Sequence, residues 1–198
     1  MYNRLSHVFR NIILVNVLVY VVMLIVGQEQ FGLNVNSNNA AFWYLGVNRG
    51  LVLQRHEFWR LLTYGFAHGS LTHIGFNMFA LYNLSSVVIR FTSEKFAVAA
   101  YFISMLVAGI ATVLFSNSIA VGASGAIYGF FGVIIYFAYR NYKIGHSEML
   151  KSLIPTLVIN AVITLMPGIS LIGHVSGLLA GFICAMVYER KIKRMYWR

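Results

Sequence analysis

The chain has 198 residues, of which 59% are hydrophobic and only 10% are charged. Water-soluble domains carry about 25% charged residues, so a soluble globular protein is excluded, and the high apolar content also excludes an intrinsically disordered chain. With 2 Pro and 1 Cys, the chain fits neither a collagen-like protein nor a disulfide scaffold. We therefore expect an all-α polytopic membrane protein with a single domain over residues 1–198 and no soluble accessory domain.

The net charge of +10 lies in short clusters of Lys and Arg between apolar runs. This distribution is typical of the cytoplasmic loops of membrane proteins, which are enriched in basic residues. Nucleic acid is not an expected partner, because no basic and aromatic patch or groove-reading motif is present. The basic C-terminal end is better suited to acidic lipid head groups of the bilayer.

Six apolar segments are long enough to suggest membrane helices. They cover residues 11–27, 70–89, 95–115, 123–139, 152–167 and 171–188. With the N-terminus in the cytoplasm, 12 of the 15 Lys and Arg residues lie inside, and only Arg49, Arg55 and Arg60 lie outside. The positive-inside rule therefore predicts a multi-pass protein of a cell membrane, the bacterial plasma membrane, with both termini cytoplasmic.

A long connection, residues 28–69, joins the first two segments. It contains two aromatic clusters, around Trp43 and around Trp59, the second of which is followed by Arg60. Aromatic residues beside basic ones favour the membrane interface. We expect one or two short helices lying on the outer leaflet, and the alternative is a loop that only packs over the helix bundle.

Four polar residues are predicted to lie at a common depth in the membrane. Counted back from the basic residues that end the second, fourth and sixth segments, Ser124 and His174 lie about 24 Å above the inner surface, His73 about 26 Å and Asn77 about 20 Å. In a hydrocarbon core of about 30 Å, all four fall in the outer third. A single Ser or His in a membrane helix is usually a packing or hydrogen-bonding residue, but this convergence indicates a site.

Glycines on two of these helices favour close packing around that site. They recur every four residues, at Gly125 and Gly129 in the fourth segment and at Gly173, Gly177 and Gly181 in the sixth. Such spacing lets two helix backbones approach closely, which a short serine side chain needs in order to reach an imidazole. Ser124 also follows Gly122 at the start of a helix, where free N–H groups point outward. These donors, with His73 and Asn77, are suited to stabilising an oxyanion.

The sequence restricts the choice of catalytic base. All five acidic residues are Glu, none of them near the predicted depth, so a Ser-His-Asp triad and a pair of catalytic carboxylates are excluded. If Ser124 is a nucleophile, His174 is its base in a two-residue dyad. A metal site is the main chemical alternative, but no HExxH motif is present and no carboxylate lies nearby. We expect no metal and no cofactor, and we interpret Cys184 as a packing residue.

Several of these motifs occur together in one known family. The run from Gly122 to Gly129 (GASGAIYG) resembles the GxSGxxYG signature of the rhomboid intramembrane serine proteases. The second segment, with His68, His73 and Asn77, is similar to their second-helix motif, and HVSGLLAG from His174 is similar to their sixth-helix motif. Trp59 and Arg60 are similar to the Trp-Arg pair of their first loop. The resemblance covers essentially the whole chain.

The resemblance implies a rhomboid-type bundle of six transmembrane helices with an interfacial first loop. It implies that Ser124 and His174 cleave a peptide bond, that the Ser124 N–H, His73 and Asn77 form the oxyanion hole, and that Tyr128 packs on the His174 ring. Substrates would be single-span or multi-span membrane proteins, cut near the outer membrane face at small residues. The loop 166–173 would act as a cap, and the fifth helix as a lateral gate.

One departure and two alternatives accompany this interpretation. Many family members carry Glu-Arg at the inner end of the second helix, whereas Ile89 precedes Arg90 here, and Glu94 is a candidate for partial replacement of that carboxylate.

A catalytically silent rhomboid-like binder or chaperone of membrane helices is the first alternative, although both Ser124 and His174 are present. A small transporter is the second; its only hints are isolated polar residues such as Asn160 and Thr164, which single interhelical hydrogen bonds explain.

Overall fold

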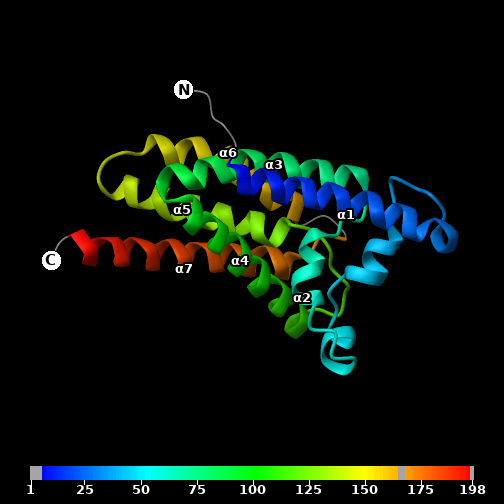
Figure 1. The fold of residues 1–198 in the computed structure, drawn as a ribbon. Helices are drawn as coiled ribbons and strands as arrows, with labels where there is room; N and C mark the ends of the chain where they lie inside the picture. The colour runs from blue at the N-terminus through cyan, green and yellow to red at the C-terminus, as the bar shows by residue number, and fades with distance from the viewer. Residues whose placement is uncertain (1–5, 165–167, 197–198) are drawn as a thin grey trace.

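The structure, a computed structural model, describes residues 6–164 and 168–196, and most of these are helical. A long helix lies at each of the predicted segments (Figure 1). Their bounds are α1 (His7–Phe31), α3 (Leu71–Phe91), α4 (Glu94–Phe115), α5 (Ser124–Lys143), α6 (Glu148–Thr164) and α7 (Leu171–Tyr196). Several helices extend past their apolar segments, because backbone hydrogen bonding continues through polar residues. The end of the fifth segment, 165–167, lies outside the described residues.

Four of these helices are long and apolar enough to cross a membrane, judged by length and composition over the described residues: α1, α3, α4 and α7. The two others fall short for different reasons. The described part of α6 has only 17 residues, and α5 has 20, of which several are Gly or Tyr and two in its last turn are basic. The all-helical prediction is confirmed, whereas the count of six membrane spans stays a prediction.

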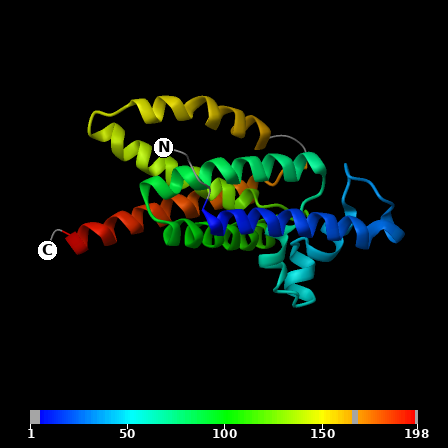
Figure 2. The same ribbon diagram turned by 45° about the horizontal axis from the view of Figure 1, so that its top comes forward.

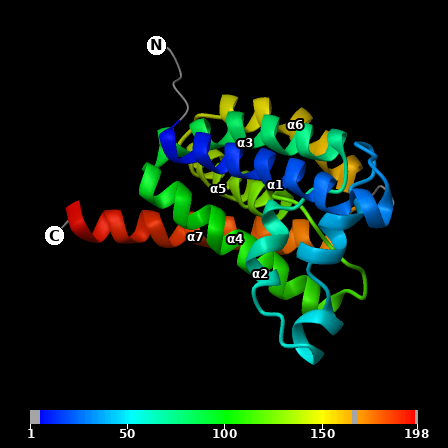
Figure 3. The same cartoon turned by 45° about the vertical axis from the view of Figure 1, so that its right-hand side comes forward.

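Helix α5 is the centre of the bundle. It packs against α7, α4 and α3, and most of its residues on every side are buried. Helices α1 and α3 lie side by side on one face of the bundle (Figures 1 and 3). Helix α6 lies at the opposite edge from α4 and packs on α5 (Figure 2). The start of α1 and the end of α7 point toward the same end of the bundle.

Local sequence signals set where several helices begin and end. The Oγ atom of Ser70 accepts a hydrogen bond from the backbone N–H of His73, and that of Ser93 accepts one from Phe96, so both serines cap the helices that follow them. Helix α1 ends at Gly32, whose φ of 74° suits a glycine. The Ser70 cap fixes the first turn of α3, which carries His73.

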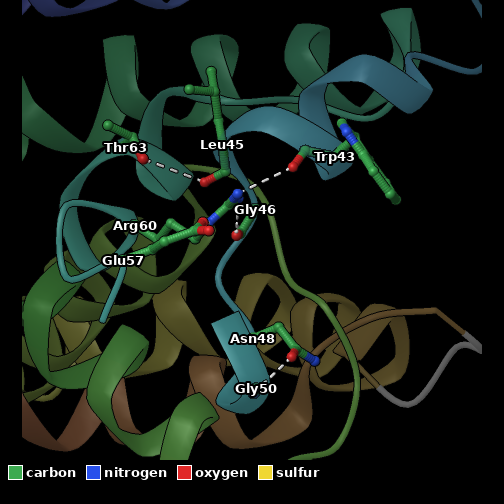
Figure 4. Close-up of polar contacts among 8 residues, drawn as sticks. All are labelled: Trp43, Leu45, Gly46, Asn48, Gly50, Glu57, Arg60 and Thr63. Atoms are coloured by element: carbon green, nitrogen blue, oxygen red, sulfur yellow. Dashed lines mark hydrogen bonds and ion pairs between the residues drawn. The ribbon is translucent and has the colours of Figure 1, made fainter. Parts of the chain in front are cut away.

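The first loop contains four short helical turns rather than the one or two helices expected from the sequence. They are η1 (Ala41–Leu45), η2 (Gly50–Gln54), α2 (Arg60–Thr63) and η3 (Tyr64–Phe66). Side chains as well as backbone N–H groups satisfy the carbonyl groups of this loop. Arg60, only 6% exposed, pairs with Glu57 and donates to the carbonyl oxygens of Gly46 and Trp43 (Figure 4).

A carboxylate network lies at the far end of α5, away from the first loop. The Glu189 carboxylate of α7 accepts a hydrogen bond from the Tyr136 hydroxyl and pairs with Arg140 at 3.1 Å. Glu94, the candidate replacement considered above, is exposed in the first turn of α4. A carboxylate network therefore exists without a Glu at position 89, and it joins α5 to α7.

Candidate active site

Ser124 and His174 lie within hydrogen-bonding distance, although they are 50 residues apart in the chain. Ser124 is the first residue of α5, and His174 is in the first turn of α7. The Oγ atom of Ser124 is 2.9 Å from Nε2 of His174, and the imidazole is buried. This is the geometry that an imidazole needs in order to take a proton from a hydroxyl group.

Glycines permit the close approach of α5 and α7 that this contact requires. A Cβ atom at Gly177 would lie 2.1 Å from the carbonyl oxygen of Gly125, and one at Gly181 would lie 1.9 Å from that of Gly129. Distances this short essentially never occur for real Cβ atoms. Any larger residue at these positions would push the two helices apart, so the glycines set the distance across the site.

The His174 ring is held on one face and at its second nitrogen. Tyr128, one turn after Ser124 on α5, stacks on the ring with 3.9 Å between the ring centroids and 14° between the planes. Nδ1 of His174 is 2.9 Å from Oγ1 of Thr164, at the end of the described part of α6. Side chains from α5 and α6 thus orient a ring that α7 carries.

The turn before α5 places backbone donors beside Ser124. Gly122 has a φ of 121°, in a region that residues with a Cβ atom rarely adopt, and the chain enters α5 directly after this turn. The N–H groups of the first turn of a helix have no acceptor within the helix. A Cβ atom at Gly122 would lie 2.8 Å from the ring of His73, so that imidazole lies directly against the turn.

Asn77 lies one turn after His73 on α3. Its Nδ2 atom donates to the carbonyl oxygen of His73, in its own helix, at 2.8 Å. A side-chain amide carries two N–H donors, and this bond uses only one of them. The Oδ1 atom of Asn77 is buried and has no hydrogen-bond partner among the described residues.

The first loop supports the segment that leads to Ser124. Val47 and Ala120 exchange two backbone hydrogen bonds of 2.9 Å, and the N–H of Gly122 donates to the carbonyl oxygen of Tyr64 at 2.8 Å. These contacts join two loops that are far apart in the sequence. The position of the Gly122 turn therefore depends on the first loop as well as on α5.

His68 also supports this segment. It is fully buried between η3 and α3, and its Nε2 atom is 3.5 Å from the backbone nitrogen of Ala123. Burial, with a smaller contribution from His73, lowers the pKa of His68 to about 3. The ring is therefore neutral at physiological pH, and its Nε2 atom accepts the hydrogen bond from Ala123.

A cavity of about 20 Å³ opens beside the Ser124 and His174 side chains. Its wall includes the side chains of Tyr64, Thr112 and Ser170. The cavity has room for about one water molecule, which the polar groups of this wall can hold by hydrogen bonds. Among the described residues, no group of three or more His, Cys, Asp or Glu side chains is arranged to hold a metal ion.

Sequence reasoning missed the contact of Thr164 with His174. The signal was present, since Thr164 lies 13 residues after Lys151, which places it about 20 Å from that inner anchor, as deep as Asn77. Unlike the helices of Ser124, His174 and His73, α6 begins rather than ends near its basic residue. Glu189 is 100 residues from Ile89 in the sequence, so proximity along the chain gives no hint of its role.

Comparison with known proteins agrees with the motifs. Residues 55–191 match the family model of the Rhomboid domain. The chain is 29% identical over 151 residues to Rhomboid protease GluP of Bacillus subtilis (strain 168), covering 76% of this chain and 30% of GluP. It is 31% identical over 157 residues to Putative rhomboid protease YdcA of the same strain, covering 77% of this chain and 75% of YdcA. Rhomboid-like protease 1 of Toxoplasma gondii is 31% identical over 160 residues, which are 75% of this chain and 53% of that protein.

The chain thus spans less than a third of GluP but three quarters of YdcA. The family model matches more than half of the chain, and the motifs that carry the resemblance at Ser124, His174, His73 and Asn77 all lie within the matched residues. Four apolar helices are long enough to cross a membrane. The chain therefore belongs to the rhomboid family and is a multi-pass membrane protein.

Proposed function

We propose that the protein is an intramembrane serine endopeptidase in which Ser124 is the nucleophile and His174 the general base. The observation that carries the proposal is the 2.9 Å contact between Ser124 Oγ and the buried His174 Nε2. The similar relatives named rhomboid proteases support the same reaction. A dyad is sufficient in principle, because serine hydrolases with other two-residue combinations, such as Ser-Lys, also exist.

In the first half of the reaction, Ser124 Oγ attacks the carbonyl carbon of the scissile peptide bond while His174 Nε2 takes the hydroxyl proton. The resulting imidazolium then gives that proton to the leaving amine, and an acyl-enzyme remains on Ser124. In the second half, a water molecule from the adjoining cavity attacks the acyl group, and His174 again acts first as base and then as acid. The proton balance closes without a cofactor.

The developing oxyanion would be stabilised by the N–H of Ser124, by the His73 imidazole and by the Asn77 amide. The first-turn N–H groups are already oriented, since they belong to a rigid helix. His73 lies against the Gly122 turn. Asn77 would contribute the second N–H of its amide, because the bond to the carbonyl oxygen of His73 uses only one of the two.

Substrates would be single-span or multi-span membrane proteins, cut near the outer membrane face. This placement follows from six spans, cytoplasmic termini and a bacterial plasma membrane, as the positive-inside rule predicts. The exposed side chains of Trp43 and Trp59, 61% and 57% accessible, suit a first loop at the interface. Helix α6, at the edge of the bundle, would be the lateral gate. The proposed cap, 166–173, falls partly outside the described residues.

The alternative, a silent binder of membrane helices, has less support. A protein that only binds would need no aligned nucleophile and base, and both are present here in contact. The two functions differ in one measurable respect, because a binder retains its substrate intact.

The test is cleavage of a single-span substrate in proteoliposomes by the wild type, Ser124→Ala and His174→Ala. We expect cleavage by the wild type alone, with both variants folded and inactive. A fluorophosphonate probe should label the wild type and not Ser124→Ala. Cleavage by Ser124→Ala at the wild-type rate would refute the assignment of the nucleophile, and binding of intact substrate without cleavage or labelling would favour the alternative.

A further inference from the structure

Nδ1 of His174, the ring nitrogen that does not face Ser124, has a hydrogen-bonding partner that takes no part in the proposed proton transfers. Oγ1 of Thr164 lies 2.9 Å from Nδ1, on the opposite side of the ring from Ser124. The Thr164 side chain is only 6% exposed, so bulk water does not compete for this contact. In Ser-His-Asp proteases the corresponding ring nitrogen is held by a carboxylate, which this chain lacks at that position.

The hydrogens around Thr164 can be assigned by counting donors. Its hydroxyl group has one hydrogen, and Oγ1 lies 2.8 Å from the carbonyl oxygen of Asn160, one turn earlier on α6. A carbonyl oxygen can only accept, so the Thr164 hydrogen belongs to that bond. The Tyr128 hydroxyl donates to the same carbonyl oxygen at 2.9 Å, and it also lies within hydrogen-bonding distance of Thr164 Oγ1.

With its hydrogen donated to Asn160, Thr164 Oγ1 can only accept from His174. The hydrogen bond of 2.9 Å then requires that Nδ1 carries the ring proton. A neutral imidazole has one N–H group, so Nε2, the atom that faces Ser124, is unprotonated. This is the tautomer that can take the serine proton. The opposite tautomer would leave Nε2 protonated and unable to act as a base.

We propose that Thr164 is a positioning residue that selects the active tautomer of His174 and fixes the plane of its ring. Thr164 does not touch the reacting atoms. Its catalytic consequence rests on the proposed function, whereas the hydrogen bond and the tautomer do not. Because Thr164 is on α6 and His174 on α7, the contact exists only while the end of α6 near Thr164 stays packed beside the dyad.

The test uses three substitutions in the full chain. Thr164→Val keeps the shape of the side chain and removes the hydroxyl group, and Thr164→Ser restores the hydroxyl group in a smaller side chain. Thr156→Val makes the same chemical change two turns earlier on α6, where the side chain is exposed, and serves as the control. Each variant is assayed for kcat and KM in proteoliposomes, and the tautomer of His174 is read from the ¹⁵N shifts of its imidazole.

We expect Thr164→Val to lower kcat about two- to tenfold, the factor of a single neutral hydrogen bond, with KM within twofold of the wild type. Thr164→Ser should recover most of kcat, and Thr156→Val should match the wild type. The ¹⁵N spectrum should show a protonated Nδ1 in the wild type and in Thr164→Ser, and a mixture of tautomers in Thr164→Val.

Other outcomes overturn the inference in distinguishable ways. Wild-type kcat and an unchanged ¹⁵N spectrum in Thr164→Val would overturn it while leaving the protease intact. Equal losses of kcat in Thr164→Val and Thr164→Ser with an unchanged tautomer would show a packing role only, and would also overturn it. If the wild type itself cleaves nothing, the proposed function fails, and the ¹⁵N spectra alone decide whether Thr164 selects the tautomer.

Discussion

Replacing Gly177 with alanine tests whether the packing of α5 and α7 sets the geometry of the dyad. The new Cβ atom would meet the carbonyl oxygen of Gly125 at 2.1 Å, and relief of the contact to 3.0 Å requires a shift of 0.9 Å (3.0 minus 2.1). His174 lies one turn before Gly177 on the same helix. If the shift reaches its ring, the distance from Nε2 to Ser124 Oγ grows from 2.9 Å to about 3.8 Å, beyond a hydrogen bond.

A misplacement of about 1 Å at a reacting centre costs about a hundredfold in rate. We therefore expect Gly177→Ala to lower kcat about a hundredfold in the proteoliposome assay, and to destabilise the fold by about 1–3 kcal/mol through overpacking. Gly75→Ala is the matched control, because a Cβ atom there has nothing within 4 Å and alanine favours a helix. A folded Gly177→Ala variant that cleaves within threefold of the wild type would refute the claim that this packing aligns the dyad.

Four further substitutions test the oxyanion donors, the turn before α5 and the first loop. Asn77→Ala or His73→Ala should slow turnover by up to about a thousandfold with the fold retained, since one oxyanion donor is worth about 2.7–4 kcal/mol; normal turnover in both would contradict the oxyanion assignment. Gly122→Ala should lower both activity and thermal stability, because alanine is strained at a φ of 121° and its Cβ atom would meet the His73 ring; a wild-type melting curve would contradict this. Arg60→Ala should lower the free energy of unfolding by about 3 kcal/mol, because it removes one partner of a buried ion pair. The measurement is a thermal melt in detergent, with the exposed Arg90→Ala variant as the control. A melting temperature that shifts as little as that of the control would argue against a structural role for Arg60.

The sequence by itself determined where the long helices lie and which residues are candidates for the site. Apolar segments long enough for a membrane indicate helices regardless of how these pack, because the hydrogen bonds of a helix are local. A common depth for Ser124 and His174 also stays a prediction of the sequence, made from the rise per residue and the basic anchors. The absence of Asp excluded a conventional triad before any geometry was known.

Only the tertiary structure decided which side chains meet. The rise per residue gives the depth of Thr164, but only the packing of α6 on α5 brings its hydroxyl group to the His174 ring on α7. The spacing of His73 and Asn77 likewise does not reveal that the Asn77 amide donates to the His73 carbonyl oxygen of its own helix. The first loop was predicted least well, because the buried Arg60 holds its turns through carbonyl groups up to 17 residues away. Long-range side-chain contacts of this kind leave no periodic pattern in the sequence, whereas helices do.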